Sequence, residues 1–362
     1  MLTFAPRSEP SSPTPPRPIG LIVNPMSGRD VRRLVGRAQT ESLEVKRSQL
    51  ARAVVGAAAA GATQFHFVRD VFRLAEQALE YLQLDDVKLT QLEIGALTTT
   101  PSDTARAALA MKDAGCAALL VMGGDGTSRI VAGAWPDAPL VALSLGTNNV
   151  FPERVEATLA GAALGLVASG RVALEEVAQR AKVVRAKFAD GGEALALIDA
   201  VLVEGDHPGS LLPFDAGKIR RAILSRAEPD AVGMSPLGGL LLPTHRGDDA
   251  GVDVACCAPG QGGRALLAPI SPGLYRTAFV TSARRVALGE PILVEGPGIL
   301  EFDGDRERVL AAGERAELRV VRDGPWQIDV QRALTLGAER GLFLDRPHWH
   351  DEGDTGEGPG CC

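Results

Sequence analysis

Several features that would indicate particular classes of protein are missing from this sequence of 362 residues. Its five cysteines are an odd number without zinc-ligand spacing, so they suit neither a disulfide framework nor a zinc site. No apolar run reaches the roughly 18 residues that suggest a membrane-spanning helix. The net charge of −7 argues against sequence-independent nucleic-acid binding, because such binding needs surplus lysine and arginine. The start lacks the pattern of a secretory leader, and we expect a reduced, cytoplasmic protein.

The length predicts two domains, at roughly 150 residues per domain. The start is rich in proline and serine, and the tail is acidic and glycine-rich. Neither has a hydrophobic period, so we expect both to be disordered. The predicted organisation is a disordered segment 1–18, an α/β nucleotide-binding domain 19–160, a β-rich substrate domain 161–345 and a disordered tail 346–362.

The first half alternates short apolar runs with helical patterns. This alternation predicts βαβ units and a doubly wound parallel sheet, and continuous apolar runs suit strands that are buried on both faces. The predicted strands are 19–23, 63–68, 92–97, 116–122 and 140–145, and the predicted helices are 30–60, 71–84, 101–114 and 128–135.

The second half has shorter runs broken by turn residues, which predicts a β-rich, sandwich-like domain. Two Asp-Gly pairs, at 190–191 and 303–304, lie between strand-like segments and predict hairpins. Further strands are predicted at 252–257, 265–268, 277–281 and 318–321, and one helix at 216–226.

The most informative motif is Gly-Gly-Asp-Gly-Thr at residues 123–127, directly after a buried run. Gly123, Gly124 and Gly126 would let a phosphate approach the backbone without meeting a Cβ atom, and the following helix start favours an anion. Thr127 can cap that helix or bond a phosphate. Asp125 can orient or deprotonate an attacking hydroxyl, or hold Mg²⁺ through water. The alternative is an ordinary turn with a polar cap, but the full string favours function.

Two more polar loops follow predicted strands. One contains Asn24, Ser27 and Gly28, and its alternative interpretation is a plain proline turn; the other contains Gly146, Thr147, Asn148 and Asn149. Parallel sheets bind ligands at the carboxyl ends of their strands, so the three loops predict one nucleotide site. Neither a Walker string nor a Gly-x-Gly-x-x-Gly fingerprint opens the first helix, and no Gly-x-Ser-x-Gly elbow occurs.

These three loops resemble the motifs of the superfamily of NAD kinases, diacylglycerol kinases and sphingosine kinases. The segments 196–201, 235–239 and 268–274 are similar to regions of NAD kinases. The form Gly-Thr-Asn-Asn-Val-Phe-Pro at 146–152 resembles the ATP-NAD kinase-like proteins of the acetoin catabolism protein X type. The resemblance implies an NAD kinase-like fold, phosphate- and ribose-binding loops, ATP as donor with Mg²⁺, and a possible homo-oligomer.

The resemblance also implies roles for single residues. Asp125 would bond the acceptor hydroxyl and act as base, and Asp199 would line the acceptor side. Where NAD kinases carry an Asn-Glu pair, this chain has Ile198 and Asp199. Asp305 is placed like the base of the lipid kinases' Asp-Gly-Glu motif, although a hairpin turn with acidic flanks explains it equally.

The resulting hypothesis is a kinase that phosphorylates the 2′-hydroxyl of NAD, or another small hydroxyl acceptor. One alternative is a lipid or other alcohol kinase of the same superfamily. It would need a deep apolar pocket in the second domain and an essential Asp305. The other alternative is a nucleotide-binding regulator without catalysis, which the missing Asn-Glu pair favours.

Overall fold

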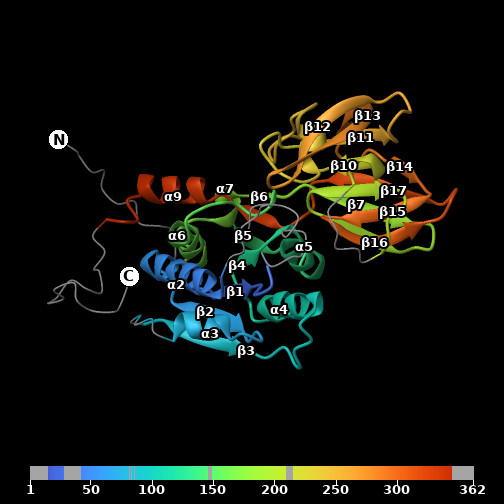
Figure 1. Cartoon of the computed structure of the whole chain (residues 1–362). Coiled ribbons are helices and arrows are strands. Elements are labelled where there is room, and N and C mark those ends of the chain that lie inside the picture. Colours follow the sequence, from blue (N-terminus) through green and yellow to red (C-terminus); the bar gives the residue numbers. More distant parts are fainter. Residues whose placement is uncertain are drawn as a thin grey trace.

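The computed structural model describes residues 15–27, 42–80, 82, 84, 86–145, 149–208 and 215–344. Figure 1 shows an α/β half built mainly from the first part of the chain and a β-rich half built from the rest. The predicted fold class is confirmed: a mostly parallel sheet covered by helices is joined to antiparallel sheets.

The first sheet has seven strands in the order β3-β2-β1-β4-β5-β18-β6. The five strands from the first half of the chain are parallel, because each is followed by a crossover that returns the chain to the same edge. Central β4 is buried along its whole length, as its apolar run predicts. The strands are β1 (Ile19–Val23), β2 (Gln64–Val68), β3 (Lys88–Leu92), β4 (Ala118–Gly123), β5 (Pro139–Ser144), β6 (Ala178–Arg180) and β18 (Trp326–Ile328).

Helices cover both faces of this sheet and bury two separate apolar clusters. One face carries α2 (Leu43–Ala59), α3 (Leu74–Leu79), α6 (Ala157–Ala168) and α9 (Val330–Glu339). The other carries α4 (Pro101–Asp113) and α5 (Asp125–Ala134). The pair α2 and α6 pack backbone to backbone, since a Cβ atom on Gly161 would lie 1.8 Å from the Ala53 carbonyl oxygen.

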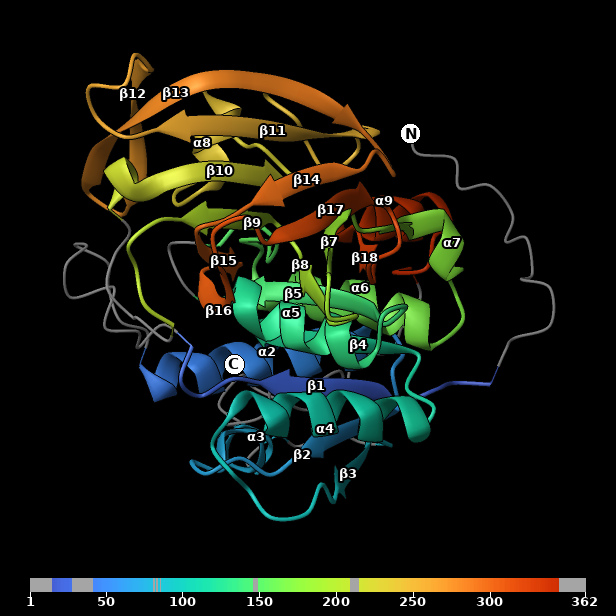
Figure 2. The ribbon, with the colours of Figure 1, turned by 90° about the vertical axis from the view of Figure 1, so that its right-hand side faces the viewer.

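The end of the chain returns to the first half. Strand β18 pairs parallel with β5, and α9 then packs beside α6, as Figures 1 and 2 show. Short α7 (Leu174–Val177) leads into β6, which pairs antiparallel with β18 at the sheet edge. A domain boundary at residue 160 therefore stays a proposal. Residues 326–339 pack with the first half as well, so the first domain would include them.

The β-rich half is a sandwich of two antiparallel sheets with a shared apolar core. The larger sheet has the order β12-β13-β11-β10-β9-β15-β16 and the smaller one β14-β17-β7-β8. Both Asp-Gly pairs form the predicted hairpin turns. The elements are β7 (Val183–Phe188), β8 (Glu193–Ala196), β9 (Asp199–Val203), β10 (Ile219–Leu224), α8 (Ser235–Gly239), β11 (Ala250–Cys257), β12 (Arg264–Ser271), β13 (Leu274–Ala287), β14 (Ile292–Glu295), β15 (Gly298–Phe302), β16 (Asp305–Leu310) and β17 (Arg315–Val321).

Two element predictions are wrong. The predicted strand 92–97 is displaced, because β3 ends at Leu92 and the apolar Ile94 and Leu97 line a cavity instead. The predicted helix 216–226 is a short 3₁₀ turn (Ala216–Lys218) followed by β10. Strand β10 pairs with β9 on one side and β11 on the other, so tertiary pairing overrides the helix-like spacing of its apolar residues.

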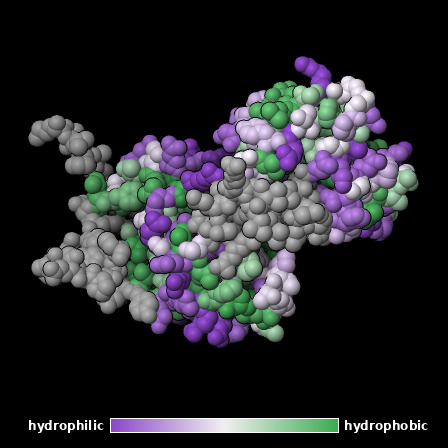
Figure 3. Space-filling view, in the orientation of Figure 1, coloured by the Kyte–Doolittle hydropathy of each residue, from purple (hydrophilic) through white to green (hydrophobic). Residues whose placement is uncertain are grey.

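The described chain begins with an ordered approach to β1. Residues 15–18 differ from the predicted disordered segment: the Arg17 N–H donates to Ala168 O, and the Arg17 guanidinium donates to Gly115 O. Residues 1–14 and the predicted tail 346–362 lie outside the described residues. None of the described helices is long and apolar enough to cross a membrane. Figure 3 shows hydrophilic and hydrophobic side chains interspersed over one face of both halves.

Candidate functional site

A cavity of about 740 Å³ lies where the two halves meet. One wall is formed by the carboxyl ends of the parallel strands β1 to β5, which is the edge at which open α/β sheets bind ligands. The second half closes the cavity with residues that follow β15, β12 and β8. The predicted site residues that line it are Asn24, Ser27, Gly124, Asp125, Gly126, Thr127, Asn149, Asp199 and Asp305. The geometry thus brings the described residues of the three predicted loops together with all three acidic candidates.

Asp125 begins helix α5, directly after the buried strand β4 and the N-cap residue Gly124. Its carboxylate accepts hydrogen bonds from the Phe151 N–H at 2.8 Å and the Val150 N–H at 3.2 Å. Two backbone donors from the loop after β5 therefore fix the orientation of this carboxylate toward the cavity.

The loop after β1 is fixed from two directions. The Asn24 amide donates to Thr127 Oγ1 at 2.8 Å, which joins this loop to the Gly-rich motif. Asn24 Oδ1 also accepts from the N–H groups of Met26 and Ser27, as in a local Asx turn. Below the loop, the fully buried Lys46 donates to the carbonyl oxygens of Pro25 and Ser27, both at 2.6 Å. Gly28 lies outside the described residues.

The glycines of the central motif allow close approach between loops. A Cβ atom on Gly124 would lie 2.8 Å from Asn149 Oδ1, and one on Gly123 would lie 2.5 Å from Thr127 Cβ. The Asn149 amide is fixed by Ser144 Oγ at 2.9 Å. Gly146, Thr147 and Asn148 lie outside the described residues, so of this third loop only Asn149 is placed in the cavity.

Asp303 is an acidic residue that the sequence interpretation treated only as a turn. Its side chain is fully buried and accepts hydrogen bonds from the N–H groups of Leu197, Ile198 and Asp199 at 2.7, 2.8 and 3.2 Å. Its φ of 49° places it in the left-handed region, which Asn and Asp tolerate better than most residues. Asp303 thereby holds the segment that carries Asp199 against the cavity.

Arg129 is a second residue that the sequence interpretation missed. This buried guanidinium on α5 donates to Asp305 Oδ2 at 2.6 Å and to Glu307 Oε1 at 2.7 Å, and lies 4.0 Å from Asp303. The ion pairs join the first half to β16 of the second half. Asp305 lines the cavity, but its carboxylate is held by a cation from the opposite half.

Burial raises the pKa values of the three buried aspartates of the cavity, and neighbouring carboxylates add to this for two of them. Desolvation, and next the charge of Asp303, raise the pKa of Asp125 to about 7. Desolvation and the charges of Asp303 and Asp125 hold the pKa of Asp199 well above its usual range. Burial also raises the pKa of Asp303, against its three backbone hydrogen bonds. A carboxylate with a pKa near 7 is suited to accept a proton from a hydroxyl at neutral pH.

The same charges do not form a metal site. Among the described residues, no group of three or more His, Cys, Asp or Glu side chains is arranged to hold a metal ion. The arrangement is suited to proton acceptance by Asp125 beside backbone loops at helix and strand ends. Residue 198, which is Ile here, is buried in the core and presents no polar group to the cavity.

Comparison with known proteins gives matches to both halves. Residues 19–172 match the model of the ATP-NAD kinase N-terminal domain, and residues 182–323 match that of the acetoin catabolism protein X C-terminal domain. The chain is similar to acetoin catabolism protein X of Cupriavidus necator, with 34% identity over 341 residues. This alignment covers 91% of the chain and 94% of the Cupriavidus protein.

The solved structures that match are more distant. Yeast NADH kinase complexed with NADH matches with a TM-score of 0.49 and 13% identity, covering 93% of this chain and 90% of that one. An NAD kinase from Archaeoglobus fulgidus in complex with ATP matches with a TM-score of 0.38 and 15% identity, covering 77% and 99%.

Proposed function

The chain belongs to the acetoin catabolism protein X family, and from this premise we propose that it is an ATP-dependent kinase whose acceptor is the 2′-hydroxyl of NAD. The observation that supports this proposal most directly is the cavity between the halves. It is lined both by the Gly-rich loop with Asp125 and, from the opposite wall, by Asp199. One side therefore offers phosphate-binding loops, and the other offers a polar group for an acceptor.

In the proposed step, Asp125 accepts the proton of the acceptor hydroxyl. The hydroxyl oxygen forms a bond to the γ-phosphorus of ATP while the bond from that phosphorus to the β–γ bridging oxygen breaks, and ADP leaves. Phosphoryl transfer depends mainly on positioning and charge stabilisation. We assign the first to Asn24, Thr127 and Asn149, and the second to the backbone N–H groups that begin α5.

The described residues around the cavity do not form a Mg²⁺ site of their own. We therefore propose that Mg²⁺ enters bound to the phosphates of ATP. The missing Asn-Glu pair affects the acceptor side instead. Ile198 faces the core, which leaves Asp199 as the polar group of this segment in the cavity.

The lipid-kinase alternative has weaker support. It requires an apolar acceptor pocket in the second half, but the apolar lining residues come mainly from the first half, around β1, β2 and α4. It also requires Asp305 as base, and that carboxylate is engaged by Arg129. The regulator alternative makes the same structural demands as the kinase and differs from it only in turnover.

The test is NADP formation by the full chain with Mg-ATP and NAD, measured with a dehydrogenase specific for NADP. We expect Asp125→Asn to lower kcat by about 10²- to 10⁴-fold, because general-base catalysis contributes about that much. The matched control is Asp137→Asn, at an exposed site just beyond α5, which should leave kcat unchanged.

Three outcomes would contradict the proposal. Equal NADP formation by Asp125→Asn and wild type would remove the role of Asp125. ADP release only on addition of a lipid alcohol would favour the lipid kinase. Tight ATP binding with no ADP release for any acceptor would favour the regulator.

A further inference from the structure

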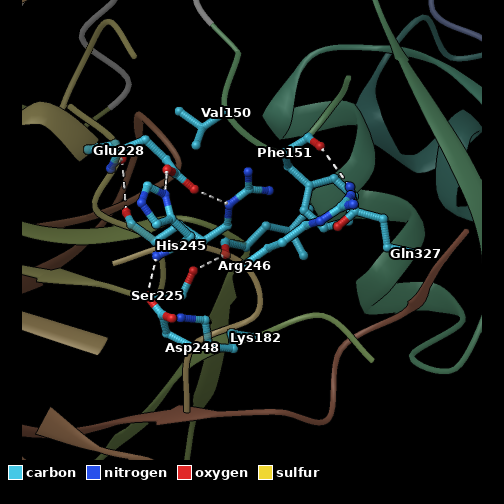
Figure 4. A network of polar contacts seen from close by, with 12 residues as sticks. Val150, Phe151, Lys182, Ser225, Glu228, His245, Arg246, Asp248 and Gln327 are labelled. Atoms are coloured by element: carbon cyan, nitrogen blue, oxygen red, sulfur yellow. Dashed lines mark hydrogen bonds and ion pairs between the residues drawn. The ribbon is translucent and has the colours of Figure 1, made fainter. Parts of the chain in front are cut away.

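A second, smaller cavity of about 250 Å³ lies beside edge strand β6 and its neighbour β18 of the first sheet. The larger cavity between the halves, for which we propose a nucleotide, is called the nucleotide cavity from here on. We call the smaller cavity the basic pocket, because five cationic side chains line it: Arg180, Lys182, Arg226, Arg246 and Arg332. Three carboxylates, Glu175, Glu176 and Asp329, also line it. Its walls come from both halves, with the loop around Arg246 on one side and Gln327 of β18 on the other (Figure 4).

Two of the three carboxylates are already neutralised. Asp329 accepts from the Arg246 guanidinium and caps helix α9 through the Arg332 N–H. Glu176 pairs with Arg340, which does not line the pocket, at 2.6 Å. Arg246 pairs in addition with Glu153, so this arginine is fully compensated. Among the five cations of the pocket, and within the described part of the chain, Arg246 is therefore the one whose charge is balanced by two carboxylates.

The remaining cations have too few carboxylate partners. Within the described residues, the buried Lys182 ammonium donates only to the Ala250 carbonyl oxygen, at 2.6 Å. Arg226 uses Nε for Glu228 at 3.2 Å, while its buried Nη1 has no hydrogen-bond partner. Arg180 and Arg332 donate to backbone carbonyls. A buried donor without a partner is costly, so this arrangement favours an added acceptor.

The lowered pKa of Lys182 agrees with the shortage of carboxylate partners in the pocket. Burial, and next the charges of Arg322 and Arg226, lower the pKa of Lys182 to about 8, against the opposing influence of Asp248 and Glu228. A cation surrounded by enough negative charge would show the opposite direction.

From this geometry we propose that the basic pocket binds a phosphate dianion, as the free ion or as the phosphate group of a small metabolite. Guanidinium groups match the oxygen geometry of phosphate, and a lysine adds a compact charge with three donors. The volume is below the usual range for sites of drug-sized ligands, which suits a small anion. The site is distinct from the nucleotide loops, because none of its cations lines the larger cavity.

The experiment is calorimetric titration of the full chain with inorganic phosphate at constant ionic strength. We expect saturable binding that Lys182→Met weakens by about ten- to hundredfold, the loss of a charge-assisted hydrogen bond. Because Lys182 is buried and its variant can fail to fold, Arg332→Gln provides a second test at the rim. Arg332 lies in the first turn of helix α9, and its loss should weaken binding by about three- to tenfold.

Two controls separate this pocket from other phosphate binding. Arg220→Gln removes a surface guanidinium paired with Glu204, and Thr127→Val alters the nucleotide loop; neither should change this affinity. The proposal fails if wild type shows no saturable phosphate binding. It also fails if Thr127→Val abolishes all binding while Lys182→Met and Arg332→Gln keep it, since phosphate would then bind only at the strand ends.

Discussion

The nucleotide cavity and the basic pocket both lie where the two halves meet, but their lining side chains have opposite net charge. The larger cavity is lined by six aspartates and one arginine, Arg69. The smaller one is lined by five cations and three carboxylates. Phe151 connects the two linings, because its N–H donates to Asp125 of the larger cavity and its carbonyl accepts from Gln327 of the smaller one at 3.2 Å (Figure 4).

This difference shows that the net charge of −7 does not describe the junction. In the nucleotide cavity, burial and next the charge of Asp303 raise the pKa of Asp125, which we propose as the base. Under the same proposal, backbone N–H groups bind the phosphates. In the basic pocket, cationic side chains are the proposed hydrogen-bond donors to the anion. Under the two proposals, the cavities bind ligands of the same charge by different means.

The largest stability effect is expected from removing the cation behind the acidic cavity. Arg129→Met leaves Asp303, Asp305 and Glu307 without their shared guanidinium. We expect a loss of about 1–3 kcal/mol in the free energy of unfolding, less than for a fully buried pair because Asp305 and Glu307 are about half exposed. Urea denaturation measures it.

Arg185→Met is the matched control for this comparison. Its guanidinium pairs with Asp323 at 2.8 Å within the second half, and both side chains are partly exposed to solvent. We expect a loss of no more than about 1 kcal/mol. If both variants lose the same stability, Arg129 does not act as a connection between the halves.

Asp303→Asn tests how the acidic cavity is organised. Asparagine keeps the left-handed backbone but presents an NH₂ group to one of the three N–H donors, so we expect a loss of about 1–2 kcal/mol. Removing the charge should also move the pH midpoint of kcat/KM downward, because Asp303 raises the pKa of Asp125. Asp190→Asn, in the exposed hairpin turn, should leave the pH midpoint unchanged, although it removes the pair with Arg308. A midpoint that does not move in Asp303→Asn would contradict the coupling.

The sequence was sufficient for the residues that lie next to each other in a motif. Asp125 and Thr127 could be identified because glycines flank them and a buried strand precedes them. Arg129 and Asp303 could not, because their roles depend on contacts with distant parts of the chain; Arg129 and Asp305 are 176 positions apart. Lys46 is similar, since it caps the loop after β1 from a helix that the motif does not include.

The fold shows the same limit. Parallel strands such as β4 were predictable because burial on both faces leaves a continuous apolar run. Edge strand β3 has exposed positions and few apolar residues. The strand was predicted at 92–97 instead, because Ile94 and Leu97 are apolar. Strand β10 is fixed by partners on both sides, which its own spacing does not show.

The opposite charges of the two cavities should also give opposite pH dependences of stability. Because the pKa of Asp125 is about 7 in the folded state and 3.8 ordinarily, the folded state binds more protons between these values. Stability is therefore lost as pH rises from about 4 to 7. Asp125→Asn should be more stable than wild type at pH 8, by about 1 kcal/mol after its weaker hydrogen bonds are counted, and not at pH 4. Thermal unfolding at both pH values measures this.

Lys182 should behave in the reverse sense. Its pKa is about 8 when folded and 10.5 ordinarily, so the unfolded state binds more protons between these values and stability is lost as pH falls from about 10.5 to 8. Lys182→Met should gain on wild type at pH 7.5 relative to pH 10, by about 1 kcal/mol or less because the Ala250 carbonyl loses its donor. Phosphate should remove this gain, since an anion in the basic pocket stabilises the charged lysine of the wild type alone. A gain that persists unchanged at saturating phosphate would mean that the anion binds elsewhere.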